Sequence, residues 1–138
     1  MHCDTIRARE VLDRGDFTCA VCRDDACYTT NLRGVKPLLQ WLEGDISLSG
    51  FCAADKVVGR AAAFLYCLLG VREVYARVMS KPAAQVLENH GIAVFADSLP
   101  DGIINRAGTG PCPFEAAVMD ITDPQEALQT IRRKLASM

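Results

Sequence analysis

The chain begins with a helical spacing of apolar residues and continues with two short runs typical of strands. Apolar positions about one helical turn apart predict a helix over residues 4–14, with Asp4 as its N-terminal cap. Residues 17–23 and 26–32 are rich in residues that favour strands, and they flank Asp24-Asp25. Acidic side chains suit a turn because they hydrogen-bond to their own backbone. These two runs therefore predict a β-hairpin.

The rest of the chain alternates predicted helices with predicted strands. We expect helices over residues 34–44, 60–69, 80–91 and 111–119 and after the Asp123 cap, and strands over residues 50–54, 71–79 and 92–95. Residues 55–60 would form a turn between strand and helix, and residues 96–110 a loop. Strands that alternate with helices imply parallel βαβ units, to which the hairpin adds an antiparallel edge. The pattern predicts an α/β fold of three α/β/α layers, with a mixed five-stranded sheet and an N-terminal β-hairpin.

Composition and charge narrow the class of protein. The chain has 138 residues, of which 50% are hydrophobic and 7% aromatic, and its net charge is -2. This length and apolar content predict a single domain over residues 1–138. The charge lacks the basic excess of a general nucleic-acid or anionic-membrane binder. We find no apolar run near the roughly 20 residues of a membrane span and no secretory signal, so we expect a cytoplasmic protein without membrane or nucleic-acid partners.

Seven cysteines are many for a chain of this length. In the predicted cytoplasmic setting we expect reduced thiols rather than a disulfide scaffold. Cys19 and Cys22, followed by Cys27, suggest a zinc site, but an odd separation places the first two on opposite faces of a strand. A structural zinc also takes four ligands, and no second close pair exists. We therefore expect packing thiols and no metal.

Two segments carry residues suited to binding an anion at the ends of the predicted strands. Asp55, Lys56 and Arg60 surround Gly59 at a junction between strand and helix, where backbone N–H groups and cations hold anions such as phosphate. Gly59 would allow a close backbone approach. The alternative is a solvated turn in which Asp55 or Gly59 caps the helix. Lys36, at the start of another helix, lies on the same predicted rim.

The second segment contains a cysteine between two prolines. Cys112 lies at a predicted helix start, where a thiol is a better nucleophile, and Glu115 follows about one turn later. Glu115 would transfer a proton or return to cap the helix. The alternative is a structural cysteine in a tight helix entry. Asn105 and Arg106 precede this segment, and Arg106 with Lys36 would suit a negatively charged ligand.

Three segments together resemble a prokaryotic family of small proteins, a domain of unknown function placed in the cytidine deaminase-like superfamily. They are Gly34-Val35-Lys36-Pro37-Leu38-Leu39, residues 54–63 and residues 105–115. The resemblance covers nearly the whole chain and implies the cytidine deaminase-like fold. It also makes a homodimer an expectation.

The zinc motifs of that superfamily are missing from the matching positions. A zinc deaminase needs a His/Cys-Ala-Glu helix start and a Pro-Cys-x-x-Cys helix start. Residues 34–36 and 55–60, which correspond to these starts, contain neither His nor Cys. Pro111-Cys112-Pro113-Phe114-Glu115 is similar to the second motif, but Glu115 replaces its second cysteine. Ordinary zinc-dependent deamination and a bound cofactor are therefore not expected.

Three hypotheses follow for the function. The first is a small anionic or nucleotide-like ligand bound in a pocket, with Cys112 as nucleophile and Glu115 as its proton-transfer partner if the protein is an enzyme. Its ligand-binding residues would be Lys36, Asp55, Lys56, Gly59, Arg60, Asn105 and Arg106. The second is an oligomeric interaction module without catalysis. The third is an unconventional deaminase or hydrolase that uses Cys112 and Glu115, or unusual metal ligands.

Overall fold

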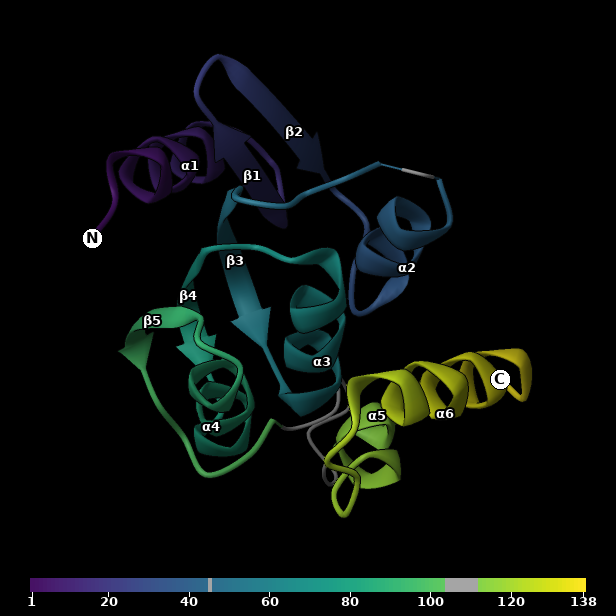
Figure 1. The fold of residues 1–138 in the computed structure, drawn as a ribbon. Coiled ribbons are helices and arrows are strands. Elements are labelled where there is room, and N and C mark those ends of the chain that lie inside the picture. Colours follow the sequence, from purple (N-terminus) through teal and green to yellow (C-terminus); the bar gives the residue numbers. More distant parts are fainter. Residues whose placement is uncertain (45, 104–111) are drawn as a thin grey trace.

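The computed structural model describes residues 1–44, 46–103 and 112–138, and Figure 1 shows their arrangement. Its elements are α1 (Cys3–Arg14), β1 (Cys19–Arg23), β2 (Ala26–Thr30), α2 (Lys36–Glu43), β3 (Cys52–Val58), α3 (Arg60–Leu69), β4 (Glu73–Met79), α4 (Lys81–Asn89), β5 (Ala93–Ser98), α5 (Pro113–Ala117) and α6 (Pro124–Ala136). No helix among the described residues is long and apolar enough to cross a membrane.

The strands form one mixed sheet in the order β2-β1-β3-β4-β5. β1 is antiparallel to both β2 and β3, whereas β3, β4 and β5 run parallel to one another. Asp24 adopts a left-handed φ of 50° in the turn between β1 and β2. The predicted α/β class, the mixed five-stranded sheet and the N-terminal β-hairpin are confirmed.

Helices cover the two faces of the sheet unequally. α1 packs on one face, where its Ala8 and Leu12 contact Ala20 and Ala54 of β1 and β3. The larger core lies on the other face beneath α3, which contacts α2, α4 and α6 (Figure 1). α3 is buried along nearly its whole length, including Phe64. Such a helix, apolar on all sides, belongs between other elements rather than at the surface.

Local capping signals place several helix ends correctly. The Asp123 carboxylate accepts a hydrogen bond from the backbone N–H of Glu126, as predicted, and Ser80 caps α4. The predicted cap of α1 is wrong: His2 Nδ1 accepts the bond from the backbone N–H of Asp4, at 3.0 Å. Asp4 lies inside the helix, where its carboxylate forms an ion pair with Arg7.

The main departure from the predicted elements is the length of β3. The strand was expected to end at residue 54, but it continues to Val58, and Asp55 pairs with Cys19 on β1 and Ala76 on β4. The polar pair Asp55-Lys56 therefore belongs to a strand rather than to a turn. β5 is also longer than expected, and its exposed Asp97 and Ser98 follow from its position at the sheet edge. α5 is shorter than the predicted 111–119.

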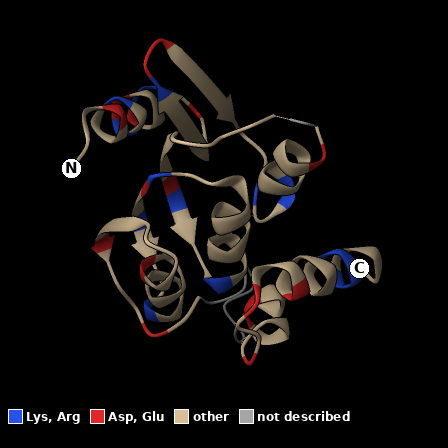
Figure 2. Cartoon of the chain, in the orientation of Figure 1, with Lys and Arg blue, Asp and Glu red and all other residues tan. Residues whose placement is uncertain are grey.

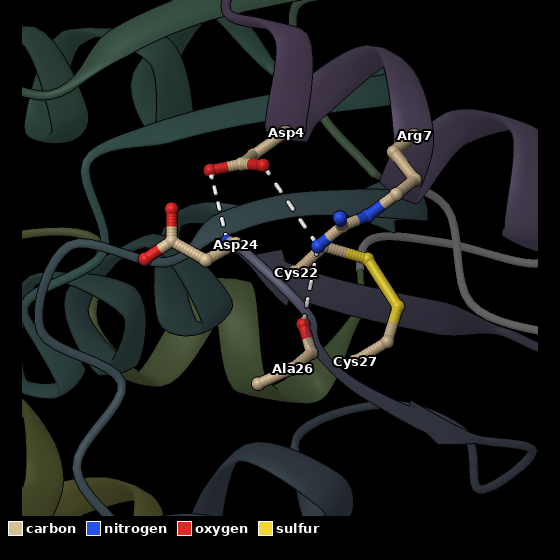
Figure 3. The surroundings of a disulfide bond; sticks show 6 residues. All are labelled: Asp4, Arg7, Cys22, Asp24, Ala26 and Cys27. Carbon is tan, nitrogen blue, oxygen red and sulfur yellow. Dashed lines mark hydrogen bonds and ion pairs between the residues drawn. A yellow bond between two sulfur atoms is a disulfide. The ribbon is translucent and has the colours of Figure 1, made fainter.

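Cys22 and Cys27 form a disulfide, so the expectation of reduced thiols is wrong for this pair. The two residues are directly opposed in the register of β1 and β2. Directly opposed side chains lie on the same face of a sheet, which brings the two sulfur atoms together. Figure 3 shows that Arg7 of α1 donates a hydrogen bond to the carbonyl of Ala26 beside this disulfide. Cys3, Cys19, Cys52, Cys67 and Cys112 are free.

Candidate functional site

A cavity of about 710 Å³ lies beside the end of β3, and we call it the main cavity. It is bounded by the starts of α2 and α3, by α5 and by the C-terminal end of α6. The described residues that line it are Thr18, Cys19, Leu32, Arg33, Gly34, Val35, Lys36, Pro37, Asp55, Lys56, Val57, Gly59, Ala61, Ala62, Ile103, Cys112, Pro113, Phe114, Glu115, Leu135 and Met138. Ligands of α/β proteins commonly bind at this edge of the sheet, beyond the carboxyl ends of the strands.

The main cavity brings together six of the nine residues predicted for the site. They are Lys36, Asp55, Lys56, Gly59, Cys112 and Glu115. Arg60 does not line it, and Asn105 and Arg106 lie outside the described residues. Segments distant in sequence therefore meet in one place, as the strand and helix order predicted.

Asp55 forms a hydrogen-bonded chain with two buried side chains at the wall of the main cavity. The Tyr66 hydroxyl donates to Asp55 Oδ2 at 2.5 Å, and Cys19 Sγ lies 3.1 Å from the same hydroxyl. Because the single hydroxyl proton of Tyr66 goes to Asp55, the Cys19 thiol is the donor of the second bond. The backbone N–H of Val57 donates to Asp55 Oδ1 at 3.3 Å. These hydrogen bonds hold the Asp55 carboxylate in place as a hydrogen-bond acceptor.

The proton affinities of these three groups follow from their burial. Burial raises the pKa of Asp55 to about 6, against the lowering effect of the hydrogen bond from Tyr66. Burial, with the nearby Asp55 charge, raises the pKa of Cys19 and of Tyr66 well above their ordinary values. Cys19 therefore remains a protonated thiol and is a poor nucleophile at neutral pH.

Glu115 occupies the helix end that was expected to bind the ligand anion. Its Oε1 accepts a hydrogen bond of 3.2 Å from the backbone N–H of Ala61, in the first turn of α3. Burial raises the pKa of Glu115, and the backbone N–H groups of α3 and the Arg60 charge oppose that rise. A Cβ atom at Gly59 would overlap the carboxylate, with the Glu115 carboxyl carbon at 2.7 Å. The close approach permitted by Gly59 is thus that of Glu115.

Arg60 connects α3 to the segment that follows α5. Its Nε donates to the carbonyl of Val118 at 3.0 Å, and Nη2 donates to the carbonyl of Ile121 at 2.5 Å. The guanidinium carbon lies 5.1 Å from the centre of the Phe64 ring. The side chain borders a second, smaller cavity of about 220 Å³. These contacts hold α5 and its following turn against α3.

Three cations line the main cavity. Lys36 and Lys56 were predicted, and Arg33, just before α2, joins them. Across residues 1–44, 46–103 and 112–138, none of the three forms an ion pair. Figure 2 shows Lys and Arg segments distributed over many elements and interleaved with Asp and Glu, so these cations are distinguished by the cavity that they share rather than by a basic face.

A group of metal-ligating side chains lies away from the main cavity. His2, Cys3 and Asp4 at the start of α1 place one ligand atom each within 4.8 Å of one another. His2 Nδ1 already accepts the hydrogen bond that caps α1. The helix starts that border the main cavity have no His or Cys at residues 34–36 and 59–62.

Sequence reasoning missed Tyr66 and Cys19. Tyr66 had a usable signal, because a hydroxyl inside an apolar helix needs a hydrogen-bond partner when it is buried. Cys19 was interpreted as a packing residue, and its place beside Asp55 depends on the β1–β3 register.

Comparison with known proteins places this architecture in a family. The family model for the domain of unknown function DUF1893 matches residues 7–135. The chain belongs to the DUF1893 family. A crystal structure of a DUF1893 family protein from Thermotoga maritima is similar to it with a TM-score of 0.88 and 24% identity, covering 97% of this chain and 92% of that one. At this identity the likeness shows the fold alone. No curated protein matches the chain.

Proposed function

We propose that this DUF1893 domain binds a small anionic ligand with an apolar body, such as a nucleotide-like compound, in the main cavity. The observation that carries the proposal is the combination, in one cavity, of three cations and the Asp55 carboxylate. The volume of about 710 Å³ falls within the roughly 300–1,000 Å³ of small-molecule sites. Arg33, Lys36 and Lys56 would hold the anionic group of the ligand.

The remaining surface of the main cavity suits a flat apolar group. Val35, Val57, Ile103 and Phe114 line it, so a ring bound there would be removed from water. The α3 N-terminus takes no part in holding the ligand anion in this proposal, because Glu115 already accepts from its backbone.

We further propose that the domain belongs to the cytidine deaminase-like superfamily. Two observations support this. The first is the strand order β2-β1-β3-β4-β5, in which α3 connects β3 to β4 and α4 connects β4 to β5. The second is the position of the main cavity at the starts of α2 and α3. These are the two helix starts that carry zinc ligands in the deaminases, and here they carry Lys36 and Gly59-Arg60 instead.

A thermal-shift experiment tests ligand binding. We expect adenosine 5′-monophosphate to raise the melting temperature of the wild-type protein, and adenosine to raise it less, because a ligand that binds only the folded state stabilises it. The Lys36→Ala/Lys56→Ala variant should lose about tenfold in affinity for the nucleotide. Lys81→Ala is the matched control, since Lys81 pairs with Asp101 at 3.0 Å outside the main cavity. An equal shift in the double variant, or no shift with the nucleotide, would overturn the proposal.

A further inference from the structure

We propose that Asp55 recognises an N–H donor of the ligand, so that the main cavity selects compounds that carry both an anionic group and an amino, amidino or amide nitrogen. This inference rests on the proposed function and specifies its ligand class. Among the described residues, Asp55 forms no ion pair with the cations of the main cavity.

The hydrogen bonds already made by Asp55 determine what it can still accept. An ionised carboxylate has about four lone-pair sites and no proton to donate. Tyr66 and the backbone N–H of Val57 each donate to one oxygen, and Cys19 and the backbone N–H of Lys56 also hydrogen-bond to the carboxylate. Asp55 is only partly buried and lines the main cavity, so a ligand in that cavity can reach the carboxylate. A hydrogen-bond acceptor of the ligand would meet a second acceptor, the Asp55 carboxylate, whereas an N–H group of the ligand would donate to that carboxylate.

Tyr66 and Cys19 keep the carboxylate in this state and are positioning residues. Both are fully buried, and the direction of their hydrogen bonds runs from the Cys19 thiol to Tyr66 and from Tyr66 to Asp55. A fixed acceptor that a ligand can reach discriminates strongly, because an unmatched buried polar group costs far more than a matched one gains.

The charged and titratable groups that hydrogen-bond with Asp55 or share the main cavity with it come from several elements. They are Cys19 of β1, Tyr66 of α3, Lys56 of β3, Arg33 just before α2, Lys36 at the start of α2, and Glu115 of α5. β4 contributes the apolar Ala76 opposite Asp55. Since the pKa of Asp55 is about 6, the carboxylate is ionised and only accepts hydrogen bonds above that pH, whereas below it the group carries a proton and one of its oxygens becomes a donor.

Two nucleotides that differ by one group isolate the contribution of Asp55. Adenosine 5′-monophosphate carries an exocyclic amino group, and purine riboside 5′-monophosphate lacks it. Both carry the same phosphate, whose own titration near pH 6 therefore cancels in the ratio of their dissociation constants. The measurement is calorimetric titration of both compounds at a series of pH values from about pH 8 to about pH 5.

In the wild-type protein we expect the amino compound to bind about tenfold more tightly at the higher pH and about equally at the lower pH. Asp55→Asn should bind the two compounds within about twofold at both pH values. Tyr66→Phe keeps the ring and should retain the preference at the higher pH. Its midpoint should move upward, because the hydrogen bond from Tyr66 lowers the pKa of Asp55.

The outcomes separate this inference from the function on which it rests. Equal binding of the two nucleotides by the wild-type protein at the higher pH, or a preference that survives in Asp55→Asn, would overturn the inference and leave anion binding intact. An unchanged midpoint in Tyr66→Phe would remove the positioning role of Tyr66. Failure of both nucleotides to bind would overturn the proposed function and this inference together.

Discussion

Glu115 places its carboxylate over Gly59, in the space that a side chain at position 59 would occupy. The contact joins α5 to the first turn of α3 and satisfies a backbone N–H that the helix itself leaves without a partner. A glycine in the middle of the cavity wall is therefore required by packing against another segment of the chain.

Gly59→Ala should lower the stability of the fold. The new methyl group displaces Glu115 from the N–H of Ala61, so we expect a loss of about 1–2 kcal/mol in the free energy of unfolding, measured by denaturant titration. Gly102→Ala is the control, because a Cβ there meets no atom of residues 1–44, 46–103 or 112–138 within 4 Å. In a Glu115→Ala background the same Gly59→Ala change should cost much less. Equal costs in the two backgrounds would contradict the contact.

Arg60→Ala should affect folding rather than ligand affinity. The variant loses two charge-assisted hydrogen bonds to the carbonyls of Val118 and Ile121, so we expect it to lose about 2–3 kcal/mol of stability. The exposed Arg14→Ala variant should change stability by less than about 0.5 kcal/mol. Nucleotide affinity of the folded Arg60→Ala protein, measured calorimetrically, should match the wild type. A tenfold loss of nucleotide affinity would show that Arg60 contributes to the ligand site.

The ionisation of Asp55 should make stability depend on pH. Its pKa is raised from 3.8 to about 6 in the folded protein, so the folded state binds the proton more tightly than the unfolded chain does. The stabilisation is fully present below about pH 4 and is lost as the pH rises through 6. Relative to Asp55→Asn, wild-type stability should fall by on the order of 2 kcal/mol between about pH 4 and pH 7. Parallel stability curves for the two proteins would show that Asp55 is not desolvated.

The Cys22–Cys27 disulfide should stabilise the hairpin. Closing so short a loop in the unfolded chain is worth roughly 2 kcal/mol, so a reductant should lower the melting temperature. The Cys22→Ser/Cys27→Ser variant should be insensitive to the reductant, and Cys67→Ser should behave as the wild type. A titration that finds seven reactive thiols in the unfolded, unreduced protein would contradict the bond.

Local sequence signals predicted the elements that depend on neighbouring residues. The Asp123 cap, the Asp24-Asp25 turn and the alternation of strands and helices all arise from interactions within a few residues. The extent of β3 was not predictable in this way. Asp55 looked like a turn residue, and its place in a strand depends on its pairing with Cys19 of β1 and Ala76 of β4.

The sequence predicted many of the residues that share the main cavity, but not the contacts that these residues make. The strand order brought Lys36, Asp55 and Cys112 to one cavity, because the ends of parallel strands share an edge. The partners of Arg60 and Glu115 lie more than fifty positions away in the sequence. No spacing or periodicity encodes such contacts. Arg60 was therefore predicted to bind a ligand and Glu115 to transfer a proton or cap its own helix, and the contacts of both with distant backbone groups were not predicted.

Amide chemical-shift mapping of the protein titrated with adenosine 5′-monophosphate tests the central claim most directly. We predict that the largest shift changes fall on backbone amides that border the main cavity, such as those of Val35, Val57 and Ala62, and that they saturate together. Amides of α1, on the opposite face of the sheet, should remain unchanged. Changes confined to α1 or β5, or no saturable change at any amide, would contradict a ligand site in the main cavity.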